Sequence, residues 1–450
     1  MRNSLKFIDL FAGLGGFHLA LSHLGCQCIF ASELKEDLQK LYRENFPGTP
    51  ILGDITKVSI SDIPAHDILC GGFPCQPFSQ AGKRQGFYDE KNRGNLFYYI
   101  ADIIRNRKPR YVFLENVANL KGHDDGNTWD VIYHTLSDDL DYEVDEAILS
   151  PHEFGIPQHR KRIYIVAGRK DLGGLGDFRF PEPTYEECDI RSIIDESDTS
   201  ITKLKPETRH QLSVWQEFID KVIAAGDSIP TFPIWAMEFG ATYDYEGLAP
   251  AYQNLNDLVG KKGKLGKRIY GDSISECLIT LPNYAQTRVS KEFPNWKKRY
   301  ICQNREFYQR HKKWLTPWLK KVADFDNSHL KLEWNCGDAT PTIEDKIIQF
   351  RASGIRVKMP TFAPALNLVG TQTPIIPWVK LPQSILSKDE PDHGRYLSLK
   401  ELSALQGMEE LNLDVNRPGF PLSLTRASEA LGNAVNVKIV ETIAQCLLNI

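Results

Sequence analysis

One cysteine in this 450-residue sequence is placed to act as a nucleophile. Cys75 lies between two prolines in a Gly- and Pro-rich segment, 71–79, that follows an apolar run. Prolines fix the backbone around the thiol, and a fixed thiol is what nucleophilic catalysis needs. A buried structural cysteine is the alternative, although such residues seldom lie in Gly/Pro-rich loops. Glu115 follows the next apolar run, so one cleft could hold both a thiol and a carboxyl group that donates a proton. The alternative for Glu115 is an acidic residue that only stabilises a helix N-terminus.

A Gly-rich segment, Asp9 to Phe17, predicts a turn between a strand and a helix. Such a turn lets a nucleotide-like ligand approach the backbone at a helix N-terminus. The spacing is Gly-x-Gly-Gly rather than Gly-x-Gly-x-x-Gly, which disfavours a dinucleotide pyrophosphate. Glu33 closes the next strand, where it could accept hydrogen bonds from a ribose diol, and Asp54 follows another helix. Together they predict a nucleoside-shaped pocket; a tight turn without a ligand is the alternative.

The elements that must position these residues follow from the apolar periodicity. Short β-rich runs alternate with segments of helical period such as 96–107. The runs are 7–10, 28–31, 68–70, 111–114 and 163–166. This alternation predicts a doubly wound parallel sheet, in which ligands bind at the carboxyl ends of the strands. Polar or Gly-rich segments follow nearly every strand, so one cleft could collect all of them.

Composition narrows the class of protein. With 42% apolar and 25% charged residues, collagen-like, disordered and coiled-coil classes are excluded for most of the chain. No apolar run approaches the ~18 residues of a membrane span, and no signal sequence is evident, so we expect a cytoplasmic protein without membrane contact. The nine cysteines form no Cys-x-x-Cys pair, which predicts reduced thiols and no metal site. The net charge of −4 requires any nucleic-acid surface to be a local basic patch.

A second domain is expected from about Asp171, where the strand-helix alternation stops. Residues 288–321 contain eleven Lys/Arg and two acidic residues, interleaved with aromatic side chains, and 261–268 form a second basic cluster. Such a composition suits phosphate contacts. The alternative is a solvated face, with the tryptophans packing a helical insert.

The ordered motifs resemble those of the C5-cytosine DNA methyltransferases of bacterial restriction-modification systems. The matching blocks are 9–17, Glu33, 53–55, 73–79, 94–97, 115–117, 158–162, 395–407 and 432–435. They cover roughly the first 170 and the last 60 residues, and the middle matches only loosely. The resemblance implies an α/β fold of the class I S-adenosylmethionine-dependent methyltransferases, a Rossmann-like, doubly wound and mostly parallel sheet, with a second, smaller target-recognition domain. The expected division is 1–175 for catalysis and cofactor binding, 176–420 for target recognition and 421–450 for a return to the catalytic domain.

The resemblance also implies a mechanism. Cys75 would attack C6 of a cytosine flipped out of the duplex while Glu115 protonates or hydrogen-bonds N3. Arg162 would hold the base O2, and Arg160 with Arg162 would stabilise the thiolate and flanking phosphates. C5 would then take the methyl group of S-adenosylmethionine, leaving S-adenosylhomocysteine and 5-methylcytosine.

Carried over block by block, the resemblance assigns further residues. The cofactor-binding set is Phe11, Gly13, Gly15, Phe17, Glu33, Asp54, Ile55, Pro74, Leu96, Asn433 and Ala434. The DNA-binding set is Gln76, Ser79, Lys83, Arg84, Arg93, Lys267, Arg268, Arg351 and Arg356. Residues 79–93 resemble the loop that closes over flipped DNA, with a solvated surface loop as the alternative. Leu34 departs from the family, which often has an aromatic residue after the ribose-binding Glu.

The partners expected from the resemblance are double-stranded DNA and a cognate restriction endonuclease that acts independently. Since one chain carries both the cofactor cleft and the reading domain, a monomer is expected, in the bacterial cytoplasm and associated with the nucleoid through DNA. A tRNA cytosine-C5 methyltransferase is the alternative, disfavoured by the long middle region. A nucleotide-binding oxidoreductase lacks support because the third glycine is missing, and a catalytically dead relative is disfavoured because every catalytic block is intact.

Overall fold

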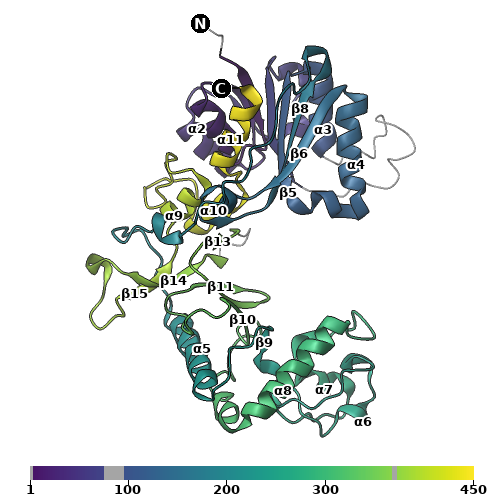
Figure 1. Ribbon diagram of the computed structural model, residues 1–450, viewed down its shortest axis with the longest axis vertical. Coiled ribbons are helices and arrows are strands. Elements are labelled where there is room, and N and C mark those ends of the chain that lie inside the picture. Colours follow the sequence, from purple (N-terminus) through teal and green to yellow (C-terminus); the bar gives the residue numbers. More distant parts are fainter. Residues whose placement is uncertain (1–3, 75–95, 367–371, 450) are drawn as a thin grey trace. The chain divides into compact units, whose positions relative to one another are not determined.

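The computed structural model describes residues 4–74, 96–366 and 372–449 (Figure 1). The chain forms two compact units. Unit 1 comprises Met1–Asp195, Thr361–Thr371 and Ser398–Ile450, and unit 2 comprises Glu196–Pro360 and Gln372–Leu397. The sequence placed the domain boundaries at 175 and 421, whereas the structure places residues 176–195 and 398–420 in unit 1. Residues 361–371, from the middle of the chain, belong to unit 1 as well.

Unit 1 is built on a seven-stranded sheet with the order β3-β2-β1-β4-β5-β8-β6. Its strands are β1 (Lys6–Leu10), β2 (Gln27–Ser32), β3 (Ile51–Leu52), β4 (Ile68–Gly72), β5 (Tyr111–Val117), β6 (Tyr142–Leu149) and β8 (Arg162–Arg169). Strands β1 to β5 pair in parallel, while β8 runs antiparallel to both β5 and β6. The doubly wound, mostly parallel sheet expected from the sequence is therefore present. The chain crosses over between β1 and β4, the point at which ligands bind in such sheets.

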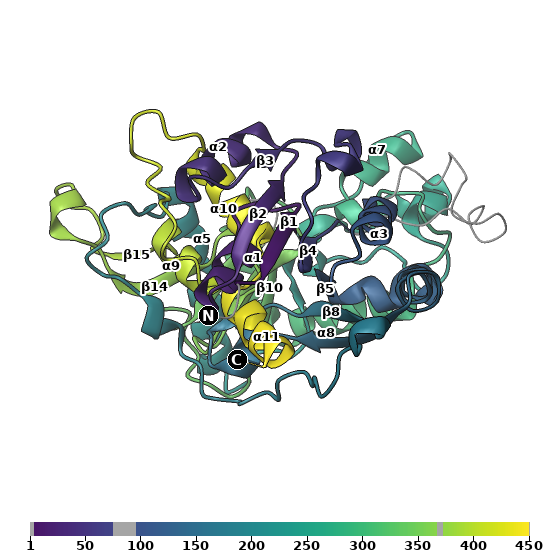
Figure 2. The same ribbon diagram turned by 90° about the horizontal axis from the view of Figure 1, so that it is seen from above.

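Helices cover both faces of this sheet (Figure 2). The helices of unit 1 are α1 (Gly16–His23), α2 (Glu36–Asn45), α3 (Leu96–Arg107), α4 (Asn127–His134), α9 (Leu399–Gln406), α10 (Leu424–Asn433) and α11 (Val437–Leu448). In α3, the segment expected to be helical, Phe97, Ile100, Ile103 and Ile104 are buried against the sheet, which is the spacing of one helix face. Because both faces are covered, β4 and β5 are apolar and buried along nearly their whole length.

The C-terminal segment returns to the first βα turn. Helix α11 packs beside α1 (Figure 2). A Cβ atom on Gly16 would lie 2.5 Å from Val435 Cγ2 and 3.0 Å from the Val435 carbonyl oxygen, so only glycine allows this approach. The side chain of Asn436 donates to the Leu405 carbonyl at 3.0 Å and caps α11. The chain end is therefore fixed directly beside the Gly-rich turn.

Unit 2 contains a six-stranded sheet, β15-β14-β11-β12-β10-β9. The strands are β9 (Ile234–Trp235), β10 (Lys331–Asn335), β11 (Ile347–Arg351), β12 (Gly354–Lys358), β14 (Ile375–Lys380) and β15 (His393–Tyr396). The helices are α5 (Pro206–Ala224), α6 (Leu255–Leu258), α7 (Ile274–Ile279) and α8 (Asn295–Trp318). A short parallel pair, β7 (Gln158–His159) with β13 (Ala363–Pro364), belongs to unit 1.

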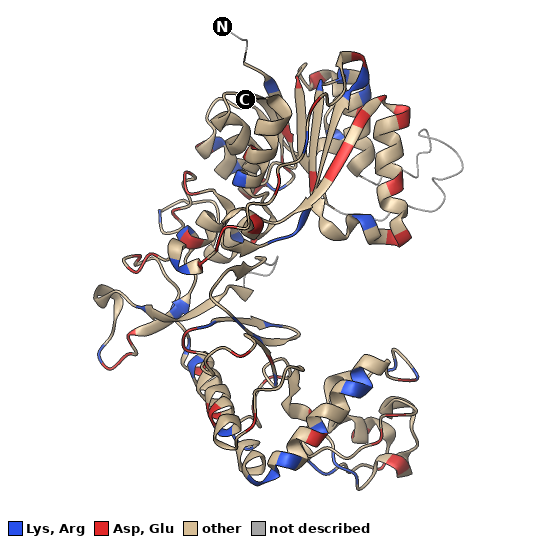
Figure 3. Cartoon of the chain, viewed as in Figure 1, with Lys and Arg blue, Asp and Glu red and all other residues tan. Residues whose placement is uncertain are grey.

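Helix α8 explains most of the aromatic content of residues 288–321. Phe307, Tyr308 and Trp318 lie in the core of unit 2. The ring centroids of Trp318 and of Trp215 on α5 are 5.3 Å apart. Trp296, in contrast, is 49% exposed. The aromatic residues thus mainly pack the helix. Several of its basic residues, such as Arg299, Arg310, Lys312 and Lys313, are exposed, whereas Arg305 is paired with the buried Glu238. Figure 3 shows the basic positions along α8 in blue.

Within the described ranges, no helix is long and apolar enough to cross a membrane.

Candidate active site

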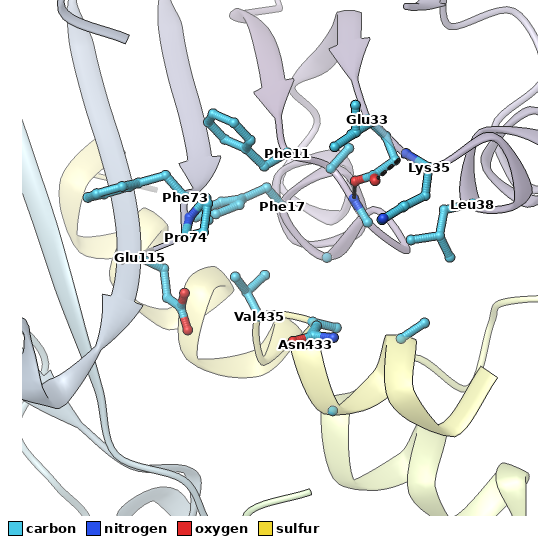
Figure 4. Close-up of a pocket in the computed structure, with 18 of the residues that line it drawn as sticks. Phe11, Phe17, Glu33, Lys35, Leu38, Phe73, Pro74, Glu115, Asn433 and Val435 are labelled. Atoms are coloured by element: carbon cyan, nitrogen blue, oxygen red, sulfur yellow. Dashed lines mark hydrogen bonds between the residues drawn. The ribbon is translucent and has the colours of Figure 1, made fainter. Parts of the chain in front are cut away.

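A cavity of about 730 Å³ opens at the carboxyl ends of β1, β2, β4 and β5 in unit 1 (Figure 4). Its lining comes from the Gly-rich turn, the ends of these strands and the C-terminal return at 432–435. Figure 4 shows the carboxyl group of Glu115 on one side of the cavity and Glu33 on the other. The cleft predicted from the strand ends therefore exists as one cavity.

Glu33 holds the Gly-rich turn in place. Its Oε2 accepts a hydrogen bond from the Gly13 N–H at 3.0 Å, and its Oε1 accepts one from the Lys35 N–H at 2.9 Å. Each carboxylate oxygen can accept a second hydrogen bond, so Glu33 could bind hydroxyl groups of a ligand as well. Gly13 and Gly15 both have positive φ angles, 55° and 86°, which glycine adopts without strain.

A buried carboxyl group lies behind the turn. Asp9 is 1% exposed and accepts a hydrogen bond from the His18 backbone N–H. Burial, with a smaller contribution from the negative charge of Glu33, raises the pKa of Asp9 to about 8. Asp9 is thus neutral at pH 7, which avoids a second unpaired negative charge beneath the turn.

Asp54 and Phe17 form two other parts of the lining. Asp54 caps the 3-10 turn Ile55–Lys57, because its Oδ1 accepts hydrogen bonds from the Thr56 N–H at 3.0 Å and from the Thr56 hydroxyl at 2.7 Å. These bonds lower the pKa of Asp54. Phe17 is buried edge-on against Phe113, with ring centroids 5.2 Å apart. The orientation of both side chains is therefore set before any ligand binds.

Glu115 and Arg162 form an ion pair at the other side of the cavity. Arg162 Nε lies 3.0 Å from Glu115 Oε1. In the antiparallel pairing of β5 and β8, Glu115 lies opposite Tyr164 and Val117 lies opposite Arg162. Glu115 and Arg162 are therefore diagonal neighbours across the two strands. Burial raises the pKa of Glu115, and the charges of Arg162 and Arg160 oppose that rise. A carboxyl group with a raised pKa retains its proton to higher pH and can serve as a proton donor.

The guanidinium group of Arg160 is hydrogen-bonded to the C-terminal return. Its Nη1 donates to the Gly432 carbonyl and its Nη2 to the Ala434 carbonyl, both at 2.8 Å. The side chain is 2% exposed, and burial lowers its pKa to about 10, so it remains charged at pH 7. Arg160 therefore clamps the backbone on both sides of Asn433 to the sheet.

The segment that carries Cys75 is anchored just before that residue. Asn116 Nδ2 donates to the Phe73 carbonyl at 2.8 Å, which joins the end of β5 to the chain leaving β4. Cys75 itself lies outside the described residues, as do the predicted DNA-binding residues Gln76, Ser79, Lys83, Arg84 and Arg93.

The cavity brings together most of the site residues predicted from the sequence. The lining includes Phe11, Gly13, Phe17, Glu33, Asp54, Ile55, Pro74, Leu96, Glu115, Arg160, Arg162, Asn433 and Ala434. Gly15 is not part of the lining. A Cβ atom at this position would lie 2.3 Å from the ring of Phe46. Leu34, which stands where members of the family often have an aromatic residue, lines the cavity and is 61% exposed.

Sequence reasoning missed several lining residues. They include Lys35, Leu38, Asn116, Leu366 and Arg426. Lys35 is adjacent to Glu33 and Asn116 to Glu115, so proximity in the sequence was an available signal. Leu366 and Arg426 had no such signal, because only the fold brings residues 361–366 and α10 to the strand ends.

The predicted DNA-binding residues that the structure describes lie in unit 2. Arg351 and Arg356 share one carboxylate, with Nη2 atoms 2.8 Å and 3.0 Å from the two oxygens of Glu333. The guanidinium group of Arg268 lies over the ring of Tyr270, 5.4 Å from its centroid, and Lys267 is exposed beside it. The DNA-binding role of these four residues remains a prediction.

No group of three or more His, Cys, Asp or Glu side chains comes together as a metal site in the described part of the chain.

Comparison with known proteins identifies the family. The profile described as C-5 cytosine-specific DNA methylase matches residues 5–449. The type II methyltransferase M.AluI of Cellulosimicrobium cellulans is 31% identical over 97% of this chain and 91% of its own length.

Other relatives match over a shorter region at higher identity. The type II methyltransferase M.HhaI of Haemophilus parahaemolyticus is 50% identical over 42% of this chain and 57% of its own length. M.HpaII of Haemophilus parainfluenzae is 47% identical over 49% of this chain and 59% of its own length. The chain thus spans little more than half the length of these two relatives. Because the family profile covers nearly every residue, the chain belongs to the C-5 cytosine-specific DNA methylase family.

Proposed function

We propose that this protein transfers a methyl group from S-adenosylmethionine to C5 of a cytosine in a short, specific sequence of double-stranded DNA. The observation that carries the proposal is the single cavity that holds the Glu33-bound Gly-rich turn on one side and the Glu115–Arg162 pair on the other. A cofactor and a reacting base need to meet in one such space. The related type II methyltransferases support the same reaction class.

The lining fits S-adenosylmethionine by its chemistry. Glu33 would accept hydrogen bonds from the ribose hydroxyls, Asp54 would accept from the adenine amine, and the rim of Phe17 would contact the adenine ring. Asn433, held by the Arg160 clamp, would close the pocket. When bound, this cofactor supplies an electrophilic methyl group. No metal is required for this chemistry.

The protein's own residues would activate the cytosine. The thiolate of Cys75 adds to C6, and Glu115 donates its proton to N3, so that the electron pair gained by the ring makes C5 nucleophilic. Arg162, 3.0 Å from Glu115, would hold the base O2. After C5 has taken the methyl group, the C5 proton leaves to solvent and the Cys75 thiolate is expelled. The proton on N3 returns to the Glu115 carboxylate, which leaves neutral, aromatic 5-methylcytosine. The target cytosine must be flipped out of the stack, at a cost of a few kcal/mol.

The test is to incubate the protein and S-adenosylmethionine with unmethylated duplex DNA and map 5-methylcytosine by bisulfite sequencing. We expect marks in one short sequence context, and none with Cys75→Ala. Transfer by Cys75→Ala at the normal rate would refute the covalent mechanism.

A matched variant tests the proton donor. Glu115→Gln keeps the size of the side chain but cannot donate a carboxyl proton, so methyl transfer should slow by about 100-fold or more. Because burial raises the pKa of Glu115, the wild-type rate should fall only as the pH rises above the usual carboxyl range, and Glu115→Gln should lose that dependence. Equal pH profiles would mean that Glu115 has only a structural role.

The same proposal extends to biological context. Methylation of one short sequence would protect host DNA from a cognate restriction endonuclease that acts independently, with this chain working as a monomer in the bacterial cytoplasm, associated with the nucleoid through DNA. The alternative, a tRNA cytosine-C5 methyltransferase, is tested by offering tRNA and duplex DNA as competing methyl acceptors. Preferential methylation of tRNA would overturn the DNA assignment.

A further inference from the structure

A second cavity lies entirely within unit 2, between α8 and the loop around residues 262–267. Its volume is about 410 Å³. Lys262, Lys267, Lys312 and Lys320 line it, and all four are exposed. No Asp or Glu is part of the lining, so the cavity carries four formal positive charges and no negative one.

These four lysines differ from two of their neighbours in the sequence, Lys261 and Lys321. Lys261 lies 3.4 Å from Asp244 and Lys321 lies 2.6 Å from Glu217. In contrast, none of the four cavity lysines has a carboxylate oxygen within 4.0 Å among the described residues. The fold thus pairs Lys261 and Lys321 with carboxylates and leaves the cavity lysines available for an external anion.

The cavity walls also offer neutral hydrogen-bonding groups. The Tyr308 hydroxyl lies 2.9 Å from Thr316 Oγ1, and both side chains belong to the lining. The bodies of Tyr308 and Leu319 are buried in the core of unit 2 and make the floor rigid. On α8, Gln309, Lys312 and Thr316 follow the spacing of one helix face, which is the face that borders the cavity.

From this arrangement we propose that the lysine cavity binds the phosphate backbone of the DNA substrate. The proposal rests on the function proposed above and adds the surface of unit 2 that holds the DNA. Four uncompensated ammonium groups attract phosphates, and each phosphate contact releases condensed counterions from the duplex. Because these contacts go to the backbone, they strengthen binding to any sequence and do not select the target.

The test compares two double variants with the same change of charge. Lys312→Gln/Lys320→Gln removes two cavity lysines, whereas Lys313→Gln/Lys321→Gln removes the two neighbouring lysines that do not line the cavity. Duplex binding is measured by fluorescence anisotropy at several salt concentrations, with a thermal unfolding curve for each variant. S-adenosylmethionine affinity is measured in parallel, because unit 1 alone supplies that cavity.

The expected magnitude follows from counterion release. Each lost phosphate contact lowers the slope of log K against log salt by roughly 0.9, which is about 8-fold in affinity at 0.1 M salt. The cavity variant should therefore bind DNA about 8-fold to 60-fold more weakly, with cofactor affinity unchanged, and the neighbour variant should lose about 2-fold or less. Equal losses in the two variants, or no loss in the cavity variant, would overturn the proposal.

Two further measurements distinguish a DNA-binding cavity from one that holds a small phosphorylated molecule. Inorganic pyrophosphate, added at constant ionic strength, should compete with DNA only weakly. If instead the protein binds pyrophosphate tightly and the cavity variant binds DNA as well as the wild type does, the cavity is a site for a small phosphorylated ligand. If the wild type methylates DNA and the cavity variant binds DNA normally, the cavity proposal alone is refuted. A wild-type protein that binds DNA through these lysines but transfers no methyl group would refute only the proposed function.

Discussion

Replacing Arg160 separates a positioning role from a direct role in catalysis. The structure shows two charge-assisted hydrogen bonds from its guanidinium group to the carbonyls of Gly432 and Ala434. Such a bond contributes about 1.5 to 3 kcal/mol net, so Arg160→Met should lose about 3 to 6 kcal/mol, since methionine fills the space without donating. The cofactor pocket needs the segment around Asn433 in place. If the lost hydrogen-bond energy weakens the packing of that segment, a loss of about 3 kcal/mol corresponds to a roughly 100-fold weaker affinity for S-adenosylmethionine.

The assay is calorimetric titration of S-adenosylmethionine, together with urea unfolding. Arg160→Lys is the control, because it keeps the charge and can retain one of the two bonds, and it should fall between wild type and Arg160→Met. A direct role on the thiolate predicts the opposite pattern, normal cofactor affinity with a slower single-turnover rate. Normal cofactor affinity of Arg160→Met would therefore refute the positioning role.

Two further predictions concern the Gly-rich turn. Asp9→Asn should change the pH dependence of stability, because the folded-state pKa of Asp9, about 8, lies above its unfolded value of 3.8. The free energy of unfolding of the wild type should therefore fall as the pH rises from about 4 to about 8. Urea unfolding of Asp9→Asn should show a shallower decline over the same range. Parallel pH curves for the two proteins would contradict the buried, neutral carboxyl group. Gly16→Ala should destabilise the protein by about 1 to 3 kcal/mol and weaken cofactor binding, because the new methyl group would meet the C-terminal segment at 2.5 Å. Gly122→Ala, whose nearest contact would be 3.7 Å, is the control, and equal stability of the two variants would disprove the close packing.

Part of the fold followed directly from local patterns. The runs 7–10, 28–31, 68–70, 111–114 and 163–166 all became strands of unit 1, because apolar runs flanked by polar turns report burial on both faces of a sheet. Strand β6 (Tyr142–Leu149) was not predicted, since charged residues such as Asp145 and Glu146 interrupt its apolar pattern at one edge of the sheet.

Local residue patterns were enough to predict the chemistry of the site: a cysteine between prolines, a glutamate after the next strand, and a Gly-rich turn with an acidic residue beyond it. Each of these signals depends on residue type and immediate neighbours alone. The partners that those groups meet depend instead on the folded chain. Arg160 and Gly432 are 272 positions apart, and their hydrogen bond requires the return of the C-terminal segment to β8.

The same distinction holds in unit 2. The sequence showed two basic clusters, 261–268 and 288–321, but a charge run looks the same whether its lysines are paired or free. The fold neutralised Lys261 and Lys321 with carboxylates from distant segments and gathered Lys262 and Lys320 around one cavity. Pairing of charges acts over a few ångströms in space, and residues far apart in the sequence meet at that distance only once the chain has folded.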